Sequence, residues 1–160
     1  MTAINPQAVR GPVTAVPVVA GKGVRLREDV ENNRVVAEVD ETVLWTGDTG
    51  MIIGSSSGSC SLSESAFNFE KIGIYAIGSV VACIELHCFE IGTSPMTFGL
   101  VVSQYESNET IFNDACVIGL SGSTLSYSNG SRTELKTTIA HRNDRGPKIV
   151  KIVGINRLSA

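Results

Sequence analysis

The chain has 160 residues, of which 42% are hydrophobic and 18% are charged, so it can hold one moderate folded domain plus an appendage, and its composition excludes a disordered chain. Its formal net charge of -3 gives no global positive field, which disfavours nucleic acid and anionic membranes as partners. The apolar runs are too short to span a bilayer and the N-terminus lacks a hydrophobic signal region, so we expect no membrane insertion and synthesis in the cytoplasm.

Composition along the chain predicts four zones. Residues 1–10 are small and polar, and we interpret them as a flexible or docking tail. Residues 11–45 contain two prolines and alternating apolar positions, which indicate an extended β stalk for oligomerisation. Residues 46–65 include GSSSGSCSLSES, a composition that usually marks a linker or an exposed loop, and we interpret them as a connection. Residues 66–160 are expected to form a β-sandwich head.

Two alternating apolar runs within residues 16–44 flank a polar turn at residues 28–33. A period of two places each run on one face of a strand. Because a lone two-stranded hairpin is marginal in water, these apolar rows need a partner surface, either the globular part of the chain or other copies of it. The residues that we expect at this oligomerisation surface are Val16, Val18, Gly21, Gly23, Val24, Leu26, Val35, Ala37 and Val39.

Short runs rich in Val, Ile, Thr and aromatic residues, separated by Gly, Asn, Ser and Pro, follow to the end of the chain. The seven predicted strands are residues 71–75, 79–89, 97–104, 115–120, 124–127, 135–141 and 148–157. Their number and spacing predict an all-β fold with an antiparallel β-sandwich or jelly roll. Asn129-Gly130 suits a type I′ hairpin turn. Helix is expected to be short, at residues 64–71 or 108–114.

One strand carries residue types that can bind zinc. Cys83, Glu85 and His87 alternate and therefore share a face of the strand at residues 79–89. Three alternate positions are spread along a straight strand, and no second cluster supplies another ligand, so we interpret them as structural and expect no metal site. The opposite face of this strand is expected to form a core row: Ile84, Leu86 and Cys88.

The remaining candidates for catalysis are weak. GLSGS at residues 119–123 looks like a nucleophile elbow but lies in a strand-to-turn context with no following helix, and the chain has only two histidines. Its four cysteines show no C-x-x-C pair, and we interpret them as reduced, mostly buried apolar residues. A Cys/His pair remains open from the sequence alone. We expect a non-enzymatic protein without catalytic residues or a cofactor.

Several short motifs together resemble a known class of proteins. GKGVRL at residues 21–26, the polar turn with Asn32-Asn33 and VVAEV at residues 35–39 resemble the repeat of fibrous viral shafts, in which strands wind around two identical chains. LSESAFNFEK at residues 62–71 and KIVGINR at residues 151–157 are similar to terminal domains of bacteriophage tail- or head-fibre proteins. Only one or two shaft repeats fit into residues 11–45, so the resemblance implies a short stalk.

The resemblance implies a structural component of a phage particle, a fibre or decoration protein made in the host cytoplasm and located in the virion. It further implies a homotrimer whose N-terminus contacts other virion proteins and whose head is displayed for host-surface or glycan binding. The residues that we expect to contact such a ligand are Tyr105, Asn108, Tyr127 and Asn129. Core packing is the alternative role of both tyrosines.

Two other functions fit the same sequence. A non-viral trimeric jelly-roll binding module, similar to tumour necrosis factor and complement C1q heads, would have the same fold and would be separated by its gene neighbours, because virion genes cluster with capsid or tail genes. A small β-barrel hydrolase is the less favoured alternative, since neither a metal set nor a catalytic triad is visible. Substrate screening of the purified protein would test it.

Overall fold

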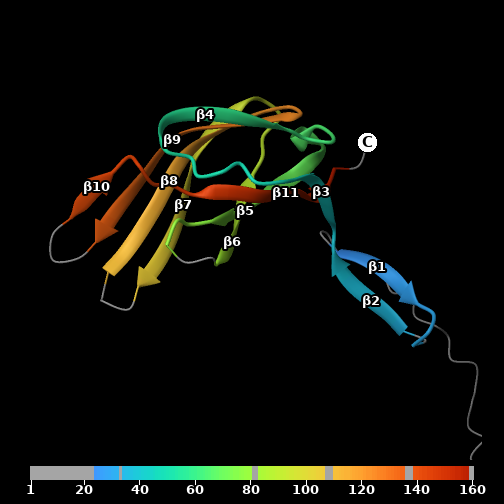
Figure 1. Ribbon diagram of the computed structural model, residues 1–160. Helices are drawn as coiled ribbons and strands as arrows, with labels where there is room; N and C mark the ends of the chain where they lie inside the picture. The colour runs from blue at the N-terminus through green and yellow to red at the C-terminus, as the bar shows by residue number, and fades with distance from the viewer. Residues whose placement is uncertain (1–23, 33, 81–82, 107–109, 136–138, 159–160) are drawn as a thin grey trace, which may run out of the picture.

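A computed structural model describes residues 24–32, 34–80, 83–106, 110–135 and 139–158. Strands dominate this part of the chain, and its one helical element is a single 3-10 turn, η1 (Ala66–Asn68). Two antiparallel sheets pack face to face, and a separate hairpin projects from them (Figure 1). The prediction of an all-β antiparallel sandwich is therefore confirmed.

The first sheet has the strand order β3-β11-β5-β6. Its strands are β3 (Glu41–Thr46), β11 (Lys148–Arg157), β5 (Phe69–Ile77) and β6 (Ile84–Glu90). The second sheet contains the meander β7 (Met96–Glu106), β8 (Thr110–Ser121) and β9 (Thr124–Leu135). The outer edge of β9 pairs along its two halves with β4 (Gly54–Ser61) and β10 (Ala140–Arg142).

The core lies between the two sheets, where alternate residues of each strand point inward. β8 shows the period of two most clearly, since buried and partly exposed residues alternate along it. Phe89 of β6 stacks on Phe98 of β7 with ring centroids 4.1 Å apart, and this contact joins the two sheets at one side. The largest fully buried side chains of the core cluster are Phe69, Ile52, Ile72, Ile74, Leu100, Ile118, Leu120, Leu125, Ile149, Ile152 and Val102.

The predicted turn at Asn129-Gly130 is wrong. Both residues lie inside β9, and the hairpin between β8 and β9 turns instead at Gly122-Ser123, where Gly122 has a φ of 57°. A glycine with positive φ at the first position suits a two-residue II′ turn. Asn129 has a φ of 55° and lies where the β8–β9 register shifts, so it is the extra residue of a β-bulge rather than a turn residue.

The Gly/Ser-rich segment is not a linker. Residues 54–61 form β4, whose Ser57, Ser59 and Ser61 point outward while Cys60 is buried. Glycine is needed at position 58 because an added Cβ would lie 2.3 Å from the hydroxyl oxygen of Tyr127. The sandwich also takes in β3, so its first strand begins at Glu41 rather than near residue 66.

Two expectations about the region around β6 also change. The strand begins at Ile84, not at residue 79. Ile84, Leu86 and Cys88 are exposed, whereas Phe89 and the alternate positions before it face the core, so the predicted core row is on the wrong face.

The two expected helix sites have different outcomes. Residues 64–71 contain only the three-residue 3-10 turn η1, which Ser65 caps by accepting a hydrogen bond from the backbone N–H of Phe67, and strand β5 begins directly after it. The described part of residues 108–114 is strand β8, so the second helix expectation is wrong there.

Candidate functional site

The first candidate surface is the hairpin of β1 (Val24–Asp29) and β2 (Arg34–Val39), which pair only with each other among the described strands. Leu26 is the register partner of Ala37, and Val24 is the register partner of Val39. Cross-strand partners share a face, so the two predicted apolar rows join into one largely apolar surface, on which Glu28 is the register partner of Val35.

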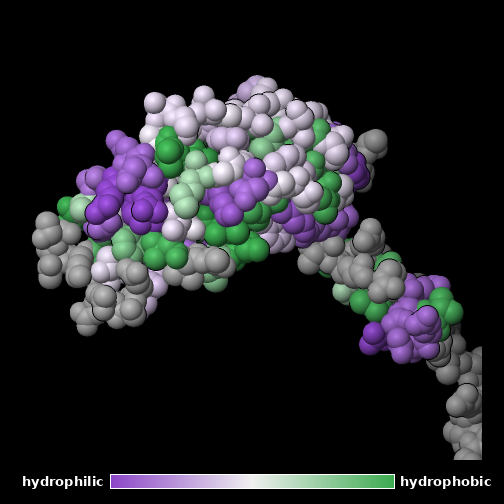
Figure 2. Space-filling view, viewed as in Figure 1, coloured by the Kyte–Doolittle hydropathy of each residue, from purple (hydrophilic) through white to green (hydrophobic). Residues whose placement is uncertain are grey.

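This surface has no cover within the described part of the chain. Val35 is 52% exposed, Val24 and Ala37 are also exposed, and Leu26 is only half-buried. Figure 1 shows the hairpin extending away from the sandwich, and Figure 2 shows hydrophobic side chains among its charged ones. Of the predicted oligomerisation residues, Val16, Val18, Gly21 and Gly23 lie outside the described residues, as does the side chain of Val39.

The turn of this hairpin is fixed by its own polar side chains. The Asp29 carboxylate accepts hydrogen bonds from Asn32 Nδ2 at 3.0 Å and from Arg34 Nε at 2.8 Å. These donors, first Asn32 and then Arg34, hold the pKa of Asp29 below its usual value. The turn therefore sets the register of the two strands without help from the sandwich.

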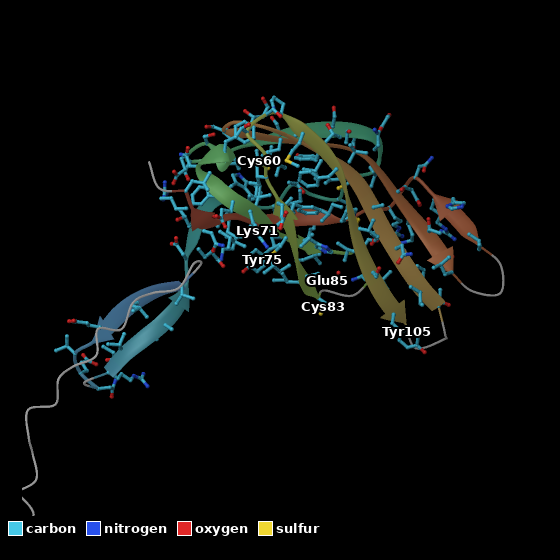
Figure 3. All side chains as sticks on the ribbon, turned by 180° about the vertical axis from the view of Figure 1, so that it is seen from behind. Cys60, Lys71, Tyr75, Cys83, Glu85 and Tyr105 are labelled. Atoms are coloured by element: carbon cyan, nitrogen blue, oxygen red, sulfur yellow. The ribbon has the colours of Figure 1, made fainter. Side chains whose placement is uncertain are left out.

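The second candidate surface is the outer face of the second sheet. Outward-facing side chains of β4, β7, β8 and β9 in the described residues include no Asp, Glu, Lys or Arg, and many of them are Ser or Thr. At the end of this face Tyr105 lies opposite Ile111, which lies opposite Leu135. Tyr105 is 65% exposed and lies at the tip of β7 in Figure 3.

A row of polar residues lies beside Tyr105, Ile111 and Leu135 on the same face, two residues further along each strand. Register aligns four residues across four strands: Ser103, Asn113, Thr133 and His141. Ser103 Oγ is 2.9 Å from Asn113 Oδ1, and Thr133 Oγ1 is 3.1 Å from His141 Nδ1. An exposed aromatic ring beside uncharged donors and acceptors is a surface that a sugar ring can contact through both its apolar and its hydroxyl groups.

The structure does not bring the other predicted ligand residues to this surface. Tyr127 packs against the core, which is the alternative role foreseen for it. Asn129 lines a separate open depression of about 390 Å³ with Asn143, at the junction of β4 and β9. Asn108 lies outside the described residues.

A buried polar network holds Ser79 and Val80, which follow β5. The carboxylate of Asp114 is fully buried and accepts hydrogen bonds from the backbone N–H and the Oγ of Ser79, each at 2.6 Å, and from Arg132 Nε at 2.9 Å. Arg132 also donates to Ser79 Oγ. Gln104 accepts a hydrogen bond from the backbone N–H of Val80 at 2.9 Å. Sequence reasoning missed this network because its members come from four separate segments.

Residue types suited to metal binding or catalysis do not converge in the described residues. His87 Nε2 lies 3.3 Å from the Glu85 carboxylate, while Cys83 precedes β6 and is exposed. No group of three or more His, Cys, Asp or Glu residues in the described ranges could hold a metal ion. Cys60 and Cys116 are buried, and burial raises the pKa of the Cys116 thiol to about 12.

Membrane-spanning helices are missing from the part of the chain that the structure describes, because none of its helical elements is long and apolar enough to cross a membrane.

Comparison of the sequence with protein-family models and with curated proteins finds no match.

Proposed function

We propose that this protein is a non-enzymatic structural component of a phage particle, a fibre or decoration protein that assembles as a homotrimer through its N-terminal hairpin. The observation that carries the proposal is the apolar surface of β1 and β2, which the described residues leave uncovered and in which Leu26 and Ala37 are register partners. It agrees with the resemblance of residues 21–39 to viral shaft repeats.

The energetics favour assembly over an isolated hairpin. Two strands alone cannot bury their apolar side chains, and fully burying one Val or Leu side chain is worth about 1.5–3 kcal/mol. Several such side chains lie on one face of this hairpin, so covering them with two further copies would contribute a free energy comparable to the stability of a small domain. A three-fold arrangement places the same face of each copy at a common axis.

The sandwich is then the displayed part, and host-surface or glycan binding is its proposed role. The surface around Tyr105, with Ser103 and Asn113 beside it, supports this role because it is exposed and uncharged. Binding to a glycan array by the wild-type protein but not by Tyr105→Ala would support it. Equal binding by both proteins would show that Tyr105 does not contribute to binding and that the ligand contacts another part of the head.

Substitutions in the full-length chain test the assembly. Leu26→Asp and Val35→Asp place a charge on the hairpin surface and are expected to convert the trimer to monomers in sedimentation equilibrium. Val30→Asp is the matched control, because Val30 lies in the turn and is 83% exposed, and it should remain trimeric. Circular dichroism should show an unchanged sandwich in all three variants, since the hairpin pairs with no other described strand.

The location in a particle needs a separate test. Antibodies raised against the purified chain should label phage particles from a producing culture, as seen by electron microscopy. Label that stays with soluble protein and leaves the particles bare would contradict the virion role even if the trimer is present.

A further inference from the structure

The outer face of the first sheet exposes several apolar side chains, among them Val43, Ile84 and Leu86. One uncharged row crosses all four of its strands: Val43, Val153, Gly73 and Cys88. Tyr75 pairs with Leu86, and Ile77 pairs with Ile84, on the neighbouring rows, and Ile84 and Leu86 are 58% and 46% exposed. Figure 2 shows hydrophobic side chains gathered at the lower edge of the sandwich, over β5 and β6. An antiparallel sheet that covers a core on one face normally presents polar residues on the other.

Gly73 makes this outer face flat and closely packed. An added Cβ at Gly73 would lie 2.7 Å from Val153 Cγ2 and 3.0 Å from Leu86 Cδ1, so these two side chains close over the glycine. Val153 is fully buried although it does not belong to the core cluster between the sheets. A packed apolar surface of this kind loses little side-chain entropy when a partner covers it.

Charged residues on the same face are paired with one another. Lys151 Nζ lies 2.7 Å from Glu41 Oε1 and 4.7 Å from the centroid of the Tyr75 ring. Lys71 Nζ lies 3.6 Å from Glu90 Oε1. Figure 3 labels both Lys71 and Tyr75 on β5. Lys148, the register partner of Ile77, is likewise paired, with its Nζ 2.9 Å from the Asp48 carboxylate. These pairs leave the face without net charge, so a neighbouring copy would meet no net repulsion there.

We propose that the outer face of the first sheet packs against a neighbouring copy of this chain and forms the contact between heads in the trimer. This inference rests on the proposed assembly through the hairpin. β2 ends at Val39 and β3 begins at Glu41, so a single residue separates the hairpin from the first sheet. Asp40, that residue, is held by its backbone carbonyl, which accepts a hydrogen bond from the backbone N–H of Asn156 at 3.0 Å. Copies joined at their hairpins therefore start their first sheets next to each other.

The size of the face explains why the hairpin is needed. Four strands about 4.8 Å apart and six residues of about 3.4 Å each give on the order of 300 Å² in projection. A stable interface buries about 800 Å² on each partner. The sheet contact is too small to hold the copies together, but the hairpin raises their effective concentration enough for it to form.

Two exposed cysteines provide internal probes. Cys88 lies in the apolar row of the face, and Cys83 lies before β6 and outside that row. In the native full-length trimer, N-ethylmaleimide followed by peptide mass spectrometry should label Cys88 more slowly than in the monomeric Leu26→Asp variant, by on the order of tenfold, because a covered thiol is not accessible. Labelling of Cys83 should be equal in the two proteins.

A matched pair of substitutions distinguishes loss of the contact at this face from a general effect of adding a charge to the sandwich. Leu86 and Val101 are both 46% exposed and both lie on edge strands, on the outer faces of opposite sheets. Leu86→Asp should restore fast labelling of Cys88 while the hairpin keeps the protein trimeric, and Val101→Asp should leave Cys88 protected.

The outcomes are distinct. Slow labelling of Cys88 in the wild-type trimer, reversed by Leu86→Asp alone, supports the head contact. A trimer in which Cys88 reacts as fast as in Leu26→Asp overturns the head contact and leaves the hairpin assembly intact. A wild-type protein that sediments as a monomer overturns both proposals, because no second copy is present to cover the face.

Discussion

Leu26 on β1 lies directly opposite Ala37 on β2, at the centre of a hairpin that pairs with no other described strand of the chain. This register puts both alternating apolar patterns on one face, and no other described residue of the chain covers that face. The hairpin has no hydrophobic core of its own, whereas the sandwich has one. Assembly and folding are therefore expected to respond to different substitutions.

Truncation should separate these two parts at residue 40. Removal of residues 1–39 is expected to leave a folded, monomeric sandwich. Removal of residues 1–46 also deletes β3, whose Leu44 is buried in the core, and should cost several kcal/mol, at the level of a large core deletion. Thermal denaturation followed by circular dichroism, with sedimentation of the shorter deletion, checks both expectations. A trimer formed without residues 1–39 would contradict the role of the hairpin.

Gly130→Ala is expected to destabilise the sandwich by about 3 kcal/mol or more, because it overfills a packed site. An added Cβ at Gly130 would lie 1.5 Å from the carbonyl oxygen of Ile52, and that oxygen belongs to the backbone and cannot rotate away. Gly99→Ala is the control, since nothing lies within 4 Å of the added atom. Urea unfolding should show a large decrease in the free energy of unfolding for Gly130→Ala and little change for Gly99→Ala.

Removal of the Arg132 side chain should destabilise the protein, because a buried carboxylate would lose its ion-pair partner. Arg132→Ala leaves the fully buried carboxylate of Asp114 without its ion-pair partner, and we expect a loss of about 3–5 kcal/mol. The double variant Asp114→Leu with Arg132→Leu removes both charges and should lose less than the sum of the single variants. A double-mutant cycle from urea unfolding measures this coupling. Strictly additive losses would contradict the coupling.

Buried thiols should be unreactive in the folded protein. Burial raises the pKa of the Cys116 thiol to about 12 and also raises the pKa of Cys60. A raised pKa lowers the fraction of thiolate, the reactive form, at every pH below that value. At neutral pH we expect maleimide to modify neither residue until the protein is unfolded in guanidinium chloride. Modification of Cys116 in the native state at the rate of a free thiol would contradict its burial.

The fold class and most strands could be predicted from the sequence, because residues that alternate between core and solvent leave a period of two. β8 is the clearest case, as its buried and partly exposed residues alternate. The hairpin rows were found for the same reason, and the structure pairs them in register. Local patterns suffice where one face of a strand is buried and the other is not.

Features that depend on distant residues could not be predicted. β4 has the composition of a linker, and glycine is required at position 58 only because Tyr127 from β9 occupies the space beside it. β6 was assigned its core row on the wrong face, because both of its faces carry apolar residues. Asn129-Gly130 has the sequence of a turn, but the β8–β9 register makes it a bulge. Tertiary contacts decided these three cases.

Sedimentation equilibrium of the full-length protein at micromolar concentration tests the central claim most directly. We expect a single species of three chains of 16.9 kDa each, about 51 kDa in total, which the Leu26→Asp variant reduces to one chain. A folded wild-type protein with the mass of a single chain at that concentration would contradict the account, because the apolar face of the hairpin would then be stable in water without a partner.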